Sequence, residues 1–214
     1  MKNFAASLMR IFSIVLLVGI IMFPFSAKAD TVSMWFTGVN GQSSYGYYID
    51  PYIATVNGVP GTPIYCVDFN REVNFGDTWT ANVTSLTASS FNNTYLKNLQ
   101  TYETMAWLIS QLPSADSTNK AAIQWVIWDL SLGKEAHSSY FTQYSYWLSQ
   151  AEANYTTIDP TKWQILTDIN GVKQEFMVDP PVTQSVPEPG ALVLLSSGLV
   201  GLASFGTIKK KLRK

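Results

Sequence analysis

One cysteine stands out among the residues that could do covalent chemistry. Cys66 is the only cysteine of the 214 residues and lies in the segment Tyr65-Cys66-Val67-Asp68. A single cysteine forms no disulfide within its own chain, which leaves burial, pairing with another molecule or a chemical task for its thiol. The thiolate is the nucleophilic form, so such a task would need a lowered pKa or a nearby proton acceptor.

One glutamine lies in unusual surroundings. Gln124 stands in the apolar segment 122–128, whose sequence is AIQWVIW. In a helix, Gln124, Ile127 and Trp128 would share one face. A glutamine buried among such neighbours needs hydrogen-bond partners or some other compensation.

The two segments together resemble the signatures of the thioester domains found in bacterial surface adhesins: an aromatic residue with cysteine, then a glutamine within an apolar, tryptophan-containing helix. The resemblance implies that the Cys66 sulfur and the Gln124 side-chain carbon join as an internal thioester with loss of ammonia. The expected pocket residues are Tyr65, Asp68, Trp125 and Trp128. Such a bond reacts with an amine or hydroxyl, which makes the domain a single-use crosslinker and not an enzyme that turns over.

From the residues alone, two plainer explanations stay open. A lone cysteine on a strand is most often a small buried hydrophobe. A glutamine between tryptophans can simply bond main-chain groups.

Other catalytic or metal-binding sets are weak in this sequence. His137 is the only histidine, and with one cysteine no familiar zinc site is expected; we read His137 as a surface residue. The carboxylates Asp68, Asp77, Asp129 and Glu135 could pair as in glycosidases, although a solvated acidic face explains them as well. We predict no metal and no cofactor.

The pattern of residues 30–179 predicts one folded α+β domain. Strands are expected at 31–39, 45–56, 64–69 and 77–86, with turn pairs such as Asn57-Gly58. Helices are expected at 93–112, from Ser117 or Thr118 to Leu132, and at 139–154. Residues 163–178 divide at Asn170-Gly171 into a hairpin. Strands, then helices, then strands favour an antiparallel sheet with the helices segregated to one side.

The N-terminus has the features of a secretory signal peptide. Lys2 and Arg10 form a positive region, residues 11–23 are apolar, and Ala27-Lys28-Ala29 is a cleavage site of the small-residue type. We predict a signal peptide over residues 1–29.

The C-terminus predicts a membrane anchor that is also a sorting signal. A linker (180–186) leads to Pro187-Glu188-Pro189, an apolar transmembrane helix over 191–208 and a basic tail. This arrangement over 187–214 resembles the PEP-CTERM sorting signal. The resemblance implies an exosortase as processing partner, attachment to the cytoplasmic membrane before cleavage, and release to the cell surface or extracellular matrix afterwards.

The charge distribution limits the partners. Residues 30–186 hold 14 acidic and six basic residues, a net charge of about −8. Nucleic acid needs clustered Lys and Arg, so it is excluded as a ligand. We therefore expect an exported adhesion or biofilm-matrix protein with a thioester, whose ligand is extracellular polysaccharide or a surface protein. The alternative is a non-covalent structural or polysaccharide-binding matrix protein that uses exposed aromatic side chains.

Overall fold

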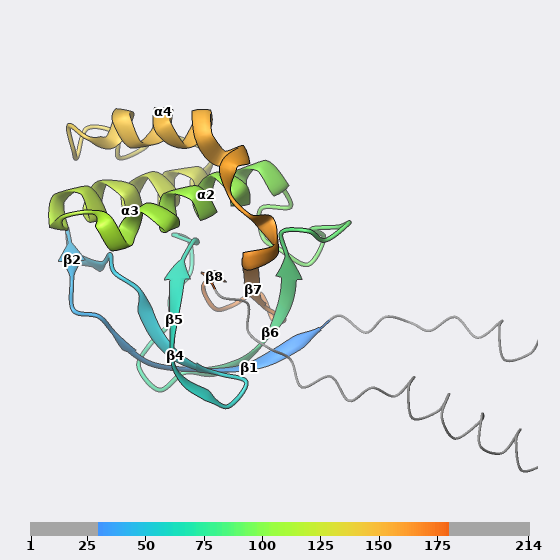
Figure 1. The fold of residues 1–214 in the computed structure, drawn as a ribbon. Helices are drawn as coiled ribbons and strands as arrows, with labels where there is room; N and C mark the ends of the chain where they lie inside the picture. Colours follow the sequence, from blue (N-terminus) through green and yellow to red (C-terminus); the bar gives the residue numbers. More distant parts are fainter. Residues whose placement is uncertain (1–29, 180–214) are drawn as a thin grey trace, which may run out of the picture. The chain divides into compact units, whose positions relative to one another are not determined.

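Residues 30–179 are described by the structure, a computed structural model of the chain (Figure 1). The predicted signal peptide, linker, sorting motif and transmembrane helix lie outside the described residues. Within the described part, no helix has the length and apolarity needed to cross a membrane.

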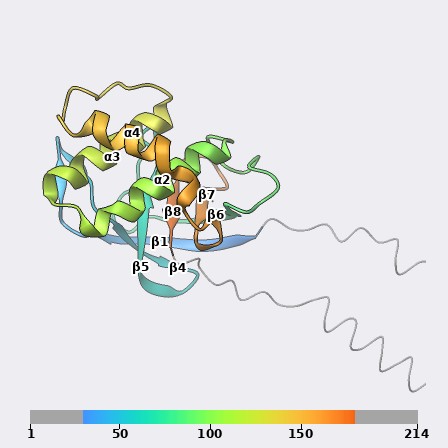
Figure 2. The ribbon, with the colours of Figure 1, turned by 45° about the horizontal axis from the view of Figure 1, so that its top comes forward.

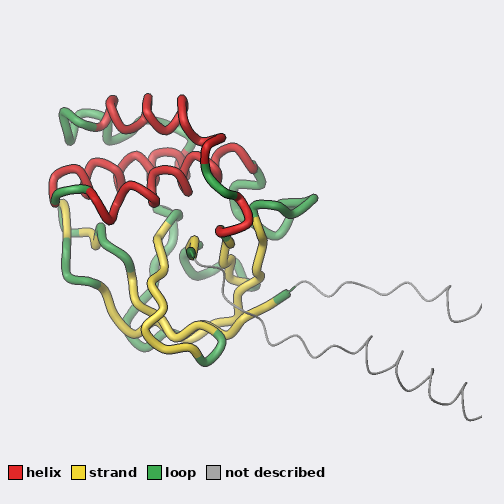
Figure 3. Tube along the Cα trace, in the orientation of Figure 1, coloured by secondary structure: helices red, strands yellow, loops and turns green. Residues whose placement is uncertain are grey.

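Six strands close into an antiparallel barrel, in the order β1-β4-β5-β8-β7-β6 (Figure 3). The strands are β1 (Thr31–Val39), β4 (Tyr52–Val56), β5 (Val59–Cys66), β6 (Thr78–Ser85), β7 (Gln164–Asp168) and β8 (Phe176–Val178). The long strand β1 makes closure possible because its first half pairs with β6 and its second half with β4. The register shifts between Phe36 and Gly38, and such an irregularity bends a strand. The predicted antiparallel sheet is present, closed on itself.

Three helices lie together on one side of the barrel, as Figure 1 and the turned view in Figure 2 show. They are α2 (Leu99–Gln111), α3 (Ser117–Leu132) and α4 (Tyr144–Asn154), with short 3₁₀ turns at Leu112–Ser114, Tyr155–Thr157 and Pro160–Lys162. The predicted segregation of the helices is confirmed. The C-terminal end of α3 at Leu132 and its stop at Gly133 match the prediction, whereas the N-cap is Asp116 and not Ser117 or Thr118; the Asp116 side chain accepts the Asn119 N–H.

Several predicted boundaries are wrong for local reasons. The expected strand 45–56 is divided into β3 (Tyr47–Tyr48), which pairs with β2 (Ser43–Ser44), and β4. Tyr45 and Gly46 both have positive φ, as a two-residue hairpin turn requires. Helix α2 begins at Leu99 instead of 93, since the main chain before it bonds to side chains, and α4 begins at Tyr144 instead of 139.

Helix α3 separates two hydrophobic clusters. Ala121, Trp125 and Trp128 join the cluster inside the barrel, which includes Cys66 of β5. Ile123, Val126 and Ile127 join the cluster between the helices and the outer face of the sheet. Both long faces of α3 are therefore buried, and any polar residue in its middle must find a partner inside the protein.

A buried carboxyl ties the segment before α2 to the barrel. Glu175 is fully buried, and its oxygens accept hydrogen bonds from the Tyr95 N–H (2.9 Å), the Thr167 hydroxyl (2.6 Å) and the Tyr102 hydroxyl. Burial raises the pKa of this carboxyl, and the three hydrogen bonds oppose the rise.

We expect Glu175→Ala to lower the free energy of unfolding by about 3 kcal/mol or more, because three buried donors lose their acceptor. Chemical denaturation of the variant and the wild type measures this difference. Glu152→Ala, on the exposed side of α4, is the control and should change the free energy of unfolding by less than about 0.5 kcal/mol. Equal effects of the two substitutions would contradict the anchoring role of Glu175.

Candidate functional site

The structure brings Cys66 and Gln124 into contact. Cys66 is the last residue of β5 and not, as predicted, in the middle of a strand; it pairs with Phe176 of β8. Gln124 lies in the middle of α3 on the side that faces the barrel. Both residues are buried, and the Gln124 amide Nε2 donates a hydrogen bond of 2.9 Å to the Cys66 carbonyl oxygen. The only side-chain amide in the interior face of α3 thus bonds the residue that carries the thiol.

The Cys66 thiol is held in its neutral form. Its S–H donates to the Asp68 carbonyl oxygen, with the sulfur 3.3 Å from that oxygen. Burial raises the pKa of the thiol to about 12, and interactions with the Asp68 main chain and the Trp128 indole reduce the rise. The thiol of Cys66 therefore does not have the lowered pKa that we expected for a reactive cysteine. A nearby acceptor is present, but it is a carbonyl oxygen and not a base.

Two of the four predicted pocket residues lie on the barrel side of α3 with the thiol. Trp125 and Trp128 pack with their rings at right angles, with centroids 4.9 Å apart, in the same cluster as Cys66. The Trp125 indole N–H donates to the Ser44 hydroxyl. The Trp128 indole N–H is buried without a hydrogen-bond partner among the described residues.

The other two predicted pocket residues have different roles. Tyr65 belongs to the second cluster, on the opposite face of β5, because successive strand residues point to opposite sides. The prediction that Tyr65 lines the pocket is wrong. Asp68 contributes its main-chain oxygen to the thiol, while its carboxylate binds Arg71 (3.1 Å) and the Asn70 N–H.

Phe69 and Tyr47 join Trp125 and Trp128 in a group of packed aromatic rings, which we call the aromatic wall. Neither Phe69 nor Tyr47 was predicted. The Phe69 ring contacts Trp125, Trp128 and Tyr47, with centroid distances of 5.2–5.6 Å. A strand continuing through 64–69 would have placed Phe69 on the face opposite Cys66. Because β5 ends at Cys66, the chain turns and Phe69 returns to the same side. No sequence signal marked Tyr47, which reaches the site from the short hairpin β2–β3.

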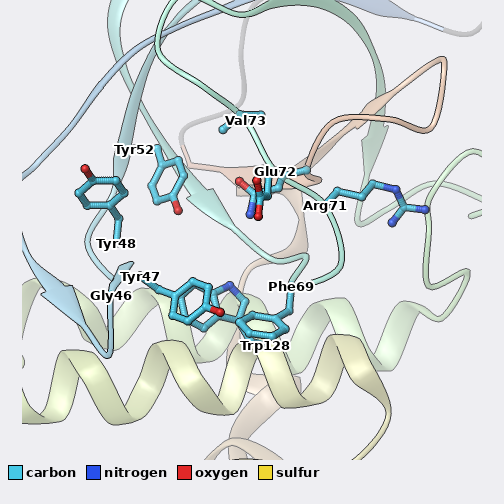
Figure 4. Close-up of a pocket in the computed structure, with 10 residues that line it drawn as sticks. Gly46, Tyr47, Tyr48, Tyr52, Phe69, Arg71, Glu72, Val73 and Trp128 are labelled. Atoms are coloured by element: carbon cyan, nitrogen blue, oxygen red, sulfur yellow. The ribbon is translucent and has the colours of Figure 1, made fainter.

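A pocket of about 260 Å³ opens beside this wall (Figure 4). Figure 4 shows Tyr47, Phe69 and Trp128 grouped next to one another, with Tyr48 and Tyr52 on another side of the space. The other lining residues are Gly46, Arg71, Glu72, Val73 and Gln174. Gln174 donates its Nε2–H to the Asp68 carbonyl oxygen that also accepts the Cys66 thiol. The pocket therefore reaches the immediate neighbours of the thiol, although Cys66 is not among its lining residues.

His137 is not the plain surface residue that the sequence suggested. Its Nδ1 lies 2.5 Å from the Asp129 carboxylate, which is buried and also accepts the His137 N–H and the Tyr144 hydroxyl. The imidazole packs on Trp125, with ring centroids 4.5 Å apart. The pair thereby holds the loop after α3 against the outer side of the aromatic wall.

The remaining carboxylates have separate partners. Asp77 pairs with Lys173 at 2.5 Å, and Asp129 and Glu135 line a common pocket beside Tyr144. Both Asp129 oxygens accept hydrogen bonds, from the Tyr144 hydroxyl and from His137. Within residues 30–179, no group of three His, Cys, Asp or Glu side chains is arranged to hold a metal ion.

The raised pKa of Cys66 predicts how the reaction rate of its thiol depends on pH. The test uses Gln124→Leu, because this variant has no side-chain amide with which the thiol could form a thioester. Between about pH 7 and about pH 10, the rate of modification by methyl methanethiosulfonate should rise about tenfold per unit without levelling off, since the thiolate fraction grows up to the folded pKa. In denaturant the rate should level off near the ordinary value of 9.0. A plateau near that value in the folded variant would contradict the buried, neutral thiol.

Known proteins give no further information on this site. Comparison of the chain with protein-family models, with curated proteins and with solved structures finds no match. The function has to be inferred from the residues of the site and from their arrangement.

Proposed function

We propose that Cys66 and Gln124 form an internal thioester through which the domain attaches covalently to a partner. The observation that carries the proposal is the 2.9 Å hydrogen bond between the Gln124 amide and the Cys66 carbonyl oxygen, made between two buried segments 58 residues apart. It holds the acyl group of one residue next to the thiol-bearing residue, and held proximity is what makes an intramolecular reaction fast.

The reaction balances without any other reactant. The thiol loses its proton, the sulfur bonds to the Gln124 side-chain carbon, and the bond from that carbon to Nε2 breaks. Ammonia leaves with the thiol proton. An amine or hydroxyl from a partner later takes the place of the sulfur, and Cys66 returns to a thiol.

The burial of the site supports a bond that survives until a partner arrives. Cys66 and Gln124 are each at most 3% exposed, and Phe69, Trp125 and Trp128 pack in the cluster that contains Cys66. Water has little access to an acyl group in such surroundings. The pocket beside Trp128 is the route by which a nucleophile of the partner would enter.

We further propose that the protein is exported and sorted to the cell surface or extracellular matrix. The supporting features are the signal-peptide pattern of residues 1–29 and the Pro187-Glu188-Pro189 motif followed by an apolar segment and basic tail. These features imply an exosortase as partner. A covalent adhesin would act in that location.

Intact mass spectrometry tests the thioester. The purified protein should be lighter than its sequence by one ammonia, and methylamine should add its own mass and release one titratable thiol. Cys66→Ala and Gln124→Leu should each have the unmodified mass expected for their sequences. Gln100→Ala, an exposed glutamine on α2, is the matched control and should retain the loss of ammonia.

An unmodified mass with an intact Gln124 and a free thiol would overturn the proposal. Gln124 would then serve only as a buried donor to the main chain. A mass higher by the difference between glutamine and glutamate, located at Gln124, would instead report a thioester that formed and was hydrolysed.

A second function, non-covalent polysaccharide binding, is favoured by exposed aromatic side chains around the pocket. Tyr45, Tyr47 and Tyr48 are 62%, 47% and 42% exposed, although water contact disfavours such rings. Phe75 and Tyr140 extend the set, with Tyr140 4.4 Å from Tyr45 between ring centroids. We call these five residues the aromatic rim. Flat rings with a carboxylate and an amide nearby suit the faces and hydroxyls of sugars.

Substitution within the aromatic rim tests this second function. Tyr47→Ala and Tyr48→Ala should each weaken retention in polysaccharide-containing gels by about tenfold in Kd, the size expected for losing one central aromatic contact. Trp35→Ala is the control, because Trp35 is equally exposed on β1 and is not part of the rim. Retention that is unaffected by the rim substitutions, or equally affected by Trp35→Ala, would exclude this role for the rim.

A further inference from the structure

The indole N–H of Trp128 is a buried donor without an acceptor. Trp128 is 1% exposed, and its Nε1 has no hydrogen-bond partner among the described residues. Among the other described tryptophans, Trp125 bonds the Ser44 hydroxyl and Trp147 bonds Asn119, whereas the Trp79 indole N–H is also buried without a partner. Burying a donor without an acceptor is unfavourable, because the donor loses its hydrogen bond to water. Such a cost at a site lined with reactive groups calls for an acceptor that is present only at some stage.

The Cys66 sulfur lies in the same buried cluster as this donor. Trp128 lies one helical turn after Gln124 on the same face of α3, and shares the barrel cluster with Cys66. The indole opposes the effect of burial on the pKa of the thiol, which means that it interacts favourably with the charged sulfur. A neutral thiol is a weak acceptor, whereas a thiolate is a strong one. The donor is thus unpaired in the resting state and satisfied when the sulfur is charged.

We propose that the Trp128 indole N–H donates to the Cys66 sulfur whenever that sulfur carries negative charge, first as the attacking thiolate and later as the departing thiolate. The proposal rests on the thioester proposed above for these two residues. It makes Trp128 a catalytic residue in both steps and not only a part of the aromatic wall.

Each step places the charge beside the same donor. In formation, the thiol loses its proton, the thiolate attacks the Gln124 side-chain carbon, and Nε2 departs as ammonia with that proton. In opening, an amine or hydroxyl adds to the same carbon and the carbon–sulfur bond breaks. The sulfur leaves with the electron pair and then takes the proton that the nucleophile has lost. No oxidant or reductant is needed.

Trp128→Phe removes the N–H and keeps an aromatic ring. In the full chain that also carries Gln124→Leu, it should slow modification of Cys66 by methyl methanethiosulfonate about ten- to a hundredfold, the effect of losing a hydrogen bond to a charged group. The smaller ring would by itself admit the reagent more easily, so a slower reaction cannot come from lost packing. Trp147→Phe, which removes an indole N–H bonded to Asn119 outside the aromatic wall, is the matched control and should leave the rate unchanged.

A second arm uses the otherwise wild-type chain. Trp128→Phe should slow opening by methylamine by a similar factor, while Trp147→Phe should not. A normal rate for Trp128→Phe in both arms would overturn the role of Trp128. If the wild-type chain has lost no ammonia, the thioester and the opening step fail together, and the Gln124→Leu arm still decides whether Trp128 stabilises the thiolate.

A chain uniformly labelled with 5-fluorotryptophan covers the case in which Trp128→Phe does not fold. The fluorine makes the indole N–H more acidic and so a better donor, with little change in shape. Faster opening by methylamine supports the proposal, and an unchanged or slower rate contradicts it.

Discussion

The hydrogen bond from the Gln124 amide to the Cys66 carbonyl oxygen is the interaction on which the site depends. It joins the end of β5 to the middle of α3, two segments that the rest of the fold must bring together. The barrel has to close so that β5 ends beneath the helices, and α3 has to present a polar side chain on a face otherwise made of Ala121, Trp125 and Trp128. A buried amide tolerates this position only with a partner, so the bond fixes how α3 sits on the barrel.

The same burial sets the chemical character of the site. It keeps the Cys66 thiol neutral and shields Gln124 from water, so neither side chain reacts readily with molecules in solution. In the proposed function, reaction between the two is favoured because they are held together, and the pocket beside the aromatic wall is the proposed route for a partner's nucleophile. The loop fixed by the Asp129–His137 pair supports that wall from outside, because the His137 imidazole packs on Trp125.

Local signals predicted much of the fold, and long-range contacts decided the rest. The C-terminal end of α3 followed from Gly133, which ends the helix in the left-handed conformation, and the turn after β4 followed from Asn57-Gly58, although β5 begins at Val59 and not at 64. The segments holding Cys66 and Gln124 were found from residue type and from their resemblance to the signatures of thioester domains. Closure of the barrel could not be predicted, since it depends on β1 pairing at both edges. Tyr65 was misplaced because successive residues of β5 point to opposite sides, and Phe69 was missed because β5 ends at Cys66.

A high-resolution crystal structure of the protein, purified without amines and at mildly acidic pH, tests the central claim most directly. The account predicts continuous electron density from Cys66 Sγ to the Gln124 side-chain carbon, at a covalent bond length and without density for Nε2. Separate side chains, with the Gln124 amide complete and still bonded to the Cys66 carbonyl oxygen, would contradict it.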